Sequence, residues 1–173
     1  AFVEKAALAH GLGAPEALHL TLAAEEIFAY QCRVGRAEAQ MDVSCAGGGY
    51  YAGVDFAFDP EAFDPRAFNL TAALSLEDEG SLDDMGLVIA SRTVDRFHIH
   101  QEEGGRLHVT LVKEKRYPEP GPSGVPAGRP GPNFSVGSPE TEEIKLFAAR
   151  AQAFYAGQAL PAFLRFPGKA ADM

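Results

Sequence analysis

A stretch rich in proline, glycine and serine, from Pro118 to Pro139, most constrains how this chain can fold. It carries few apolar side chains, so it cannot build a packed core of its own. We therefore expect the main domain of the 173-residue chain to lie before it, over residues 1–116, with a linker at 117–139. Residues 140–173 are expected to form a C-terminal helix and an apolar tail.

The charge and the apolar runs exclude two classes of partner. The formal net charge is −9 and no run of Lys or Arg occurs, which argues against direct nucleic-acid binding. No apolar run approaches the ~20 residues that a membrane-spanning helix needs. Only two cysteines are present, Cys32 and Cys45, in neither a disulfide nor a metal-ligand pattern. We expect buried thiols in a cytoplasmic protein.

Two periodicities alternate along the first 116 residues. Apolar residues at helical spacing predict helices, and alternating apolar and polar residues around glycine-rich turns predict two hairpins. The helices are expected at residues 2–10, 14–34 and 82–95, and the strands at 39–46, 49–58, 96–102 and 106–113. This order predicts an α+β fold, a two-layer sandwich in which helices cover one face of a mixed, mainly antiparallel sheet. Because the chain starts inside a helical pattern, we expect the native protein to extend further.

The C-terminal region carries a second helical signal. Ser138 is predicted to cap it, Pro139 to begin it, and an apolar stripe from Ile144 to Tyr155 to form its buried side. The following segment from Leu160 to Gly168 is too apolar to remain in water. We expect it to dock on the domain or on a partner, and a homodimer formed through this segment is one hypothesis.

Two segments, together with the short stretch FDPEAFDP at residues 58–65, resemble a known family. Residues 22–34 read LAAEEIFAYQCRV and resemble the N-box helix of anti-sigma-factor serine kinases, which belong to the histidine-kinase-like (GHKL) ATPases. Residues 82–115 look like the family's Gly-Leu-Gly-Leu helix followed by its closing Leu-Thr-Leu-Val-Lys strand. The similarity covers roughly residues 2–115, and it implies the Bergerat fold of that family. It also implies a bacterial regulatory protein.

The resemblance assigns Glu26 to the position of the family's catalytic base. The family places a Mg²⁺-binding Asn four residues later, where this chain has Tyr30. A phenol is bulkier than an amide and a poorer ligand for Mg²⁺. Without the metal, charge on a transferring phosphoryl group is not neutralised. A second reading of Tyr30 is a helix residue that points into the core.

The adenine-reading Asp-x-Gly turn of the family also differs here. A gapless alignment places Phe58 where the Asp stands and Pro60 where the Gly stands, with Asp59 between them. Removing a charged hydrogen bond to adenine costs roughly 1.5–3 kcal/mol. A shifted register puts Asp59 or Asp55 at the reading position instead.

The family's phosphate-binding Gly-Leu-Gly becomes Asp84-Met85-Gly86 in this chain, followed by Leu87. Asp83 stands beside it, so two carboxylates are expected near the place where phosphates bind in the family. Like charges there repel a nucleotide.

Two functions follow from these observations. The first is a pseudo-kinase binding module with no cofactor, which holds a sigma factor, an anti-sigma antagonist or another domain of its own chain. The alternative is an active ATP-dependent serine kinase that uses ATP and Mg²⁺, with Glu26 as base. His98 and His100 share one side of a predicted strand without an evident third metal ligand, so we interpret them as a solvated strand face.

Overall fold

The computed structural model describes residues 2–36, 38–60, 79–103, 105–118, 136–155 and 165–173. The chain divides into two compact units, Ala1–Arg116 and Tyr117–Met173. In the described residues, no helix combines the length and the apolar character that crossing a bilayer requires.

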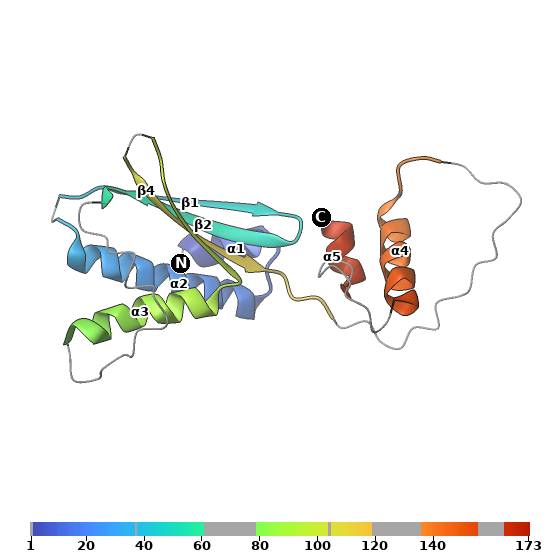
Figure 1. The fold of residues 1–173 in the computed structure, drawn as a ribbon, viewed down its shortest axis with the longest axis horizontal. Helices are drawn as coiled ribbons and strands as arrows, with labels where there is room; N and C mark the ends of the chain where they lie inside the picture. Colours follow the sequence, from blue (N-terminus) through green and yellow to red (C-terminus); the bar gives the residue numbers. More distant parts are fainter. Residues whose placement is uncertain (1, 37, 61–78, 104, 119–135, 156–164) are drawn as a thin grey trace, which may run out of the picture. The chain divides into compact units, whose positions relative to one another are not determined.

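The first unit is an α+β layer structure (Figure 1). Its elements are α1 (Phe2–Ala9), α2 (Ala14–Val34), β1 (Met41–Gly48), β2 (Tyr51–Phe58), α3 (Glu79–Thr93), β3 (Arg96–Gln101) and β4 (Leu107–Glu114). The four strands form one sheet in the order β1-β2-β4-β3, and each neighbouring pair is antiparallel. The three helices lie along one face of this sheet, as Figure 1 shows. The expected α+β architecture is therefore present, with a sheet that is antiparallel in all its described pairs.

Both N-terminal helices begin where the sequence indicates; α2 also ends there, whereas α1 ends at Ala9, one residue before the predicted end. After α1, Gly11 adopts a φ of +84°, a conformation that glycine tolerates best, and the Leu12 N–H then bonds back to the Ala7 carbonyl. Pro15 lies in the first turn of α2, where its missing N–H costs no helical hydrogen bond. At the other end, the Gly35 N–H donates to the Gln31 carbonyl.

The core lies between the sheet and the helices. Alternate residues of β2 and β4 face the helices, because strand side chains alternate between the two sides of a sheet. Each large apolar side chain that is fully buried contributes about 1.5–3 kcal/mol. The largest of these are Phe56, Phe58, Leu20, Ile27, Leu87, Leu111, Val54 and Val109.

The first hairpin turns later than the glycine run predicts. Its two-residue loop is Gly49-Tyr50, so Gly47 and Gly48 remain in β1. Space explains these two glycines: a Cβ on Gly47 would lie 2.5 Å from the His10 ring, and one on Gly48 would lie 2.6 Å from the Tyr51 ring. They provide close approach within the strand rather than a turn.

Helix α3 ends two residues earlier than predicted, because Asp95 is engaged by the sheet. The Asp95 N–H donates to the Val112 carbonyl. Its carboxylate accepts hydrogen bonds from the Glu114 N–H at 2.7 Å and from Lys113 Nζ at 3.2 Å. These contacts begin the β3 connection, so the helix cannot continue to residue 95.

The two cysteines do not share one environment. Cys45 on β1 is half-buried, and burial raises the pKa of its thiol. Cys32 is exposed, so the expectation of a buried thiol is wrong for this residue. It falls on the solvent side of α2, next to a Gln31 that is buried.

The second unit contains α4 (Thr141–Phe154) and α5 (Pro167–Asp172), which contact each other. The cap of α4 is Glu140 rather than Ser138: its side chain accepts a hydrogen bond from the Glu143 N–H, and the Glu143 side chain accepts one from the Glu140 N–H. This reciprocal capping box moves the helix start past Pro139. The apolar residues 160–164 lie outside the described residues.

Candidate functional site

Tyr30 belongs to the hydrophobic core. Its side chain extends from α2 and is only 5% exposed, within the same cluster as Ile27 and Phe56. It lines none of the described clefts. Its reading as a helix residue that points into the core therefore fits, although its neighbour Gln31 lines a cleft. The assignment of this position to the metal site of the family stays a prediction. An aromatic ring on the inward side of a largely buried helix gains more from burial than from a solvated cleft.

Phe58 lies in the same core at the end of β2. It pairs with Met41 of β1 and Leu107 of β4, and it is 1% exposed. Like Tyr30, it lines none of the described clefts itself, although the next residue, Asp59, lines one. Its strand position determines this orientation, since Phe58 shares the inward side with Val54 and Phe56.

Glu26 lies against α3. This carboxylate is on α2, and a Cβ added to Gly86 of α3 would overlap Glu26 Oε2. The backbone of α3 therefore passes directly over the candidate base, and glycine is what allows the contact. On either side of Gly86, Met85 is 40% exposed and Leu87 is buried in the core.

Two parts of the expected phosphate and adenine sites cannot be placed. The side chains of Asp83 and Asp84 lie outside the described residues, as do residues 61–65 of the FDPEAFDP stretch. The two carboxylates expected near the phosphates therefore stay a prediction.

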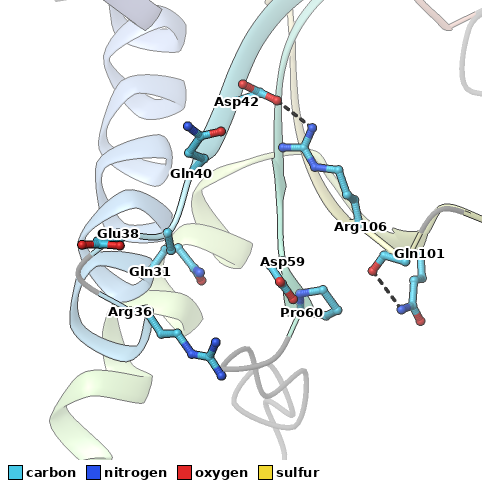
Figure 2. Close-up of a pocket in the computed structure, with 12 residues that line it drawn as sticks. Gln31, Arg36, Glu38, Gln40, Asp42, Asp59, Pro60, Gln101 and Arg106 are labelled. Carbon is cyan, nitrogen blue, oxygen red and sulfur yellow. Dashed lines mark hydrogen bonds and ion pairs between the residues drawn. The ribbon is translucent and has the colours of Figure 1, made fainter.

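A cleft of about 840 Å³ opens beyond the end of β2 (Figure 2). Asp59 and Pro60 line it together with Gln31, Arg36 and Arg106. Clefts of roughly 300–1,000 Å³ are typical of small-molecule sites. The cleft is open, most of the residues that line it have polar side chains, and Asp59 is one of them, as in the shifted alignment. This placement argues against complete loss of an acidic residue at the position that reads adenine.

Gln31 gives the wall of this cleft an unusual feature. Its side chain is 7% exposed, and among the described residues its Oε1 atom has no hydrogen-bond partner. Buried side-chain oxygens are normally paired. Arg106, on the opposite wall, already has hydrogen-bond partners. Its guanidinium donates to Asp42 Oδ2 at 2.7 Å and to the Ala57 carbonyl at 2.6 Å.

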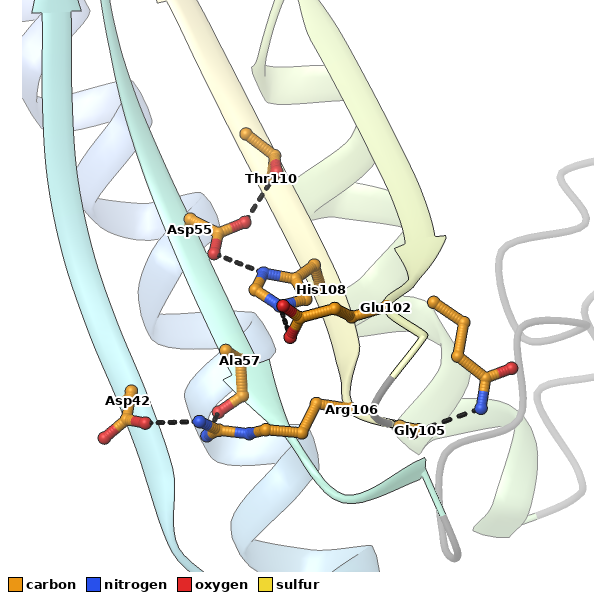
Figure 3. Close-up of polar contacts among 9 residues, drawn as sticks. Asp42, Asp55, Ala57, Glu102, Gly105, Arg106, His108 and Thr110 are labelled. Carbon is orange, nitrogen blue, oxygen red and sulfur yellow. Dashed lines mark hydrogen bonds and ion pairs between the residues drawn. The ribbon is translucent and has the colours of Figure 1, made fainter.

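A polar network lies on the face of the sheet that points away from the helices (Figure 3). Asp55 on β2 contacts His108 Nδ1 at 2.8 Å and accepts a hydrogen bond from Thr110 Oγ1 at 2.7 Å. Glu102 approaches His108 Nε2 at 3.5 Å, and His100 stacks on the His108 ring at 4.7 Å. Asp55 therefore does not face the helices, so it cannot be the adenine reader of a site on that side.

Sequence reasoning missed this network, although a signal for it exists. Asp55, His108 and Thr110 are polar residues at alternating positions of two apolar strands, which marks an outward side. Their meeting depends on the register, in which Asp55 pairs directly with Thr110. His98 and His100 do share the outward side, as expected. Within the described residues, no group of three or more His, Cys, Asp or Glu side chains is arranged to hold a metal ion.

The environment of His108 favours its protonated form. The hydrogen bond to Asp55 raises the pKa of His108, partial burial opposes the rise, and the charges of Asp55 and Glu102 add to it. The folded state therefore holds this proton more tightly than the unfolded chain. The resulting stabilisation is fully present below the ordinary His pKa of about 6.5 and is lost as the pH rises through the raised value.

We expect the free energy of unfolding to fall as the pH rises above about 6.5, the ordinary pKa of a histidine. Asp55→Asn should flatten this fall, because it removes the charge that holds the proton on His108. Urea denaturation at several pH values measures the slope. His98→Gln, which removes an exposed imidazole from the same face, should leave the slope unchanged. A slope that survives intact in Asp55→Asn contradicts the assignment to His108.

No protein-family model matches the chain, and no curated protein sequence matches it either.

Proposed function

We propose that residues 2–116 form a cytoplasmic regulatory module of the GHKL type, related to anti-sigma-factor kinases, that binds a protein partner without depending on ATP. The observation that carries this proposal is the burial of Tyr30 and Phe58 in one hydrophobic core. The resemblance assigns these two positions to the metal ligand and the adenine reader. Side chains that support the core are not available to bind a nucleotide.

The position of Glu26 supports the same proposal. A carboxylate that acts as a base must reach the hydroxyl or water that it activates. Glu26 instead lies against the α3 backbone at Gly86. With no metal ligand at Tyr30, Glu26 has no bound phosphate to act on. The partner is a sigma factor, an anti-sigma antagonist or another domain of the same chain, and self-association is tested by the concentration dependence of the mass.

A specific observation favours the alternative, an active serine kinase that uses ATP and Mg²⁺. Asp59 and Pro60 line the cleft of about 840 Å³. If the shifted alignment holds, Asp59 reads the adenine there, and Glu26 remains available as base once α3 moves. This alternative makes the opposite prediction for nucleotide binding.

We expect ATP with Mg²⁺ to leave the melting temperature unchanged. A ligand that binds only the native state stabilises it by about 2.7 kcal/mol at a hundredfold excess over its Kd. For a domain of this size that shift is roughly 5–10 °C, which differential scanning fluorimetry detects readily. The absence of a shift with ATP, ADP and GTP supports the regulatory module.

If ATP does raise the melting temperature, the variants Asp59→Asn and Glu26→Ala show which residue is responsible. A shift in millimolar ATP that disappears on chelation of Mg²⁺ and in Asp59→Asn would establish the kinase alternative. Glu26→Ala tests the base separately, because a lost base abolishes phosphate transfer while binding persists.

A further inference from the structure

Arg96 on β3 has hydrogen-bonding capacity that the described chain does not use. An arginine side chain offers five N–H donors. Within the described residues, its single ion pair is with Glu114 at 3.7 Å, longer than a hydrogen bond, and its Nε atom is buried without a partner. A guanidinium with unused donors next to a cavity is a ready site for a carboxylate.

Two tyrosine rings hold this guanidinium in place. Its central carbon lies 5.3 Å from the centre of the Tyr51 ring and 5.8 Å from that of Tyr50. The rings themselves meet edge to face at 5.0 Å. Stacking on aromatic faces orients the planar guanidinium before a ligand arrives, which lowers the entropy that binding must overcome.

Beside Arg96 lies a hollow of about 280 Å³ on the face of the sheet that the three helices leave uncovered. The register places Ala46, Gly53, Val112 and Arg96 in one row across the four strands. Ala46 contributes only a methyl group and Gly53 has no side chain, and together they create the depression between larger neighbours. The floor is apolar, and the cation stands at one end of it.

We propose that this hollow receives a single acidic side chain from an extended segment of a protein partner. The volume is below the roughly 300–1,000 Å³ of ordinary small-molecule sites but suits one side chain and its flanking backbone. The carboxylate binds the exposed part of the Arg96 guanidinium, since the side chain is 40% exposed, and the methylene stem of the acidic residue packs on Gly53 and Val112.

The charges around the hollow favour a carboxylate over a phosphate. Glu114 stands beside Arg96, and Asp55 is also among the residues that line the hollow. A phosphate carries up to two negative charges, so its repulsion by these two carboxylates exceeds that of a singly charged carboxylate. The inference builds on the proposed function, since it names a surface for the protein partner, but it does not involve the nucleotide positions.

Short peptides test the site directly. The probes are acetyl-Ala-Ala-Glu-Ala-Ala-amide and its Gln counterpart, titrated into the ¹⁵N-labelled full chain while amide shifts are followed by NMR. We expect saturable shifts at Ala46, Gly53 and Val112 with the Glu peptide and about tenfold weaker binding of the Gln peptide. Acetate and inorganic phosphate, titrated in parallel, should bind more weakly than the Glu peptide. Equal binding of the two peptides, absence of saturable shifts, or tighter phosphate binding would overturn the proposal.

Variants localise the effect. Arg96→Gln should abolish the preference for the Glu peptide, whereas Arg92→Gln, the same change at an exposed site on α3, should preserve it. Ala46→Leu fills the hollow from an exposed position on β1 and should abolish binding even if Arg96→Gln proves unstable. Persistent binding in Ala46→Leu contradicts the proposal. A nucleotide-dependent melting shift would refute the proposed function and leave the peptide result intact, so the two failures are distinguishable.

Discussion

Phe58→Asp is expected to unfold the first unit. The substitution restores the acidic residue that the resemblance expects at the adenine-reading position, but Phe58 is 1% exposed and packs in the core. Loss of the ring costs about 3–5 kcal/mol, and a buried carboxylate adds its own desolvation. The sum is a large part of the roughly 5–15 kcal/mol that stabilises an ordinary domain. Urea denaturation followed by circular dichroism measures the loss.

Phe58→Leu is the matched control for this experiment. It keeps an apolar side chain at the same position and should cost roughly 1.5 kcal/mol or less. If Phe58→Asp instead remains folded near wild-type stability, the side chain has access to solvent on the helix side. The core placement that carries the proposed function would then be wrong.

Tyr30→Asn is expected to destabilise the unit by about 3 kcal/mol or more. It restores the family's metal-binding residue, yet at this position it removes a ring that is 5% exposed and leaves an amide in a largely apolar cluster. Thermal and urea unfolding measure the change. Tyr30→Phe keeps the ring and removes only the hydroxyl, so it should cost about 1.5 kcal/mol or less.

The Tyr30→Asn variant also tests whether the nucleotide site can be restored. If Tyr30 were the only obstacle to metal binding, Tyr30→Asn would produce a Mg²⁺-dependent melting shift in ATP. We expect none, because Phe58 still fills the second position. A clear shift in the folded variant would indicate an otherwise intact nucleotide site and would favour the kinase alternative.

The order of the elements in the first unit follows from the sequence alone. Each helix and strand there has its own periodicity, and those signals are local. The helix at Ala14–Val34, for example, has the predicted bounds, because Pro15 and Gly35 act within their own turns. The predicted boundary was wrong where a distant contact determines it. The Asp95 N–H donates to the Val112 carbonyl, and α3 therefore ends before residue 95.

Long-range pairing explains what sequence reasoning missed in the sites. Asp55 and His108 are 53 positions apart and meet only because β2 pairs with β4 in one register. The unused donors of Arg96 likewise become visible only when its neighbours are known.

The alternation of residues in β2 already places Phe58 on the same side as Val54 and Phe56, so its apolar surroundings were predictable from the chain. The chain alone did not predict which face of the sheet the helices cover. It therefore did not predict whether that side of β2 is core or cleft. That choice depends on how α2 and α3 pack against the strands, since burial of apolar surface is a property of the assembled layers and not of any one segment. The tertiary structure thus decided that Tyr30 and Phe58 lie in the core while Asp59 lines the open cleft.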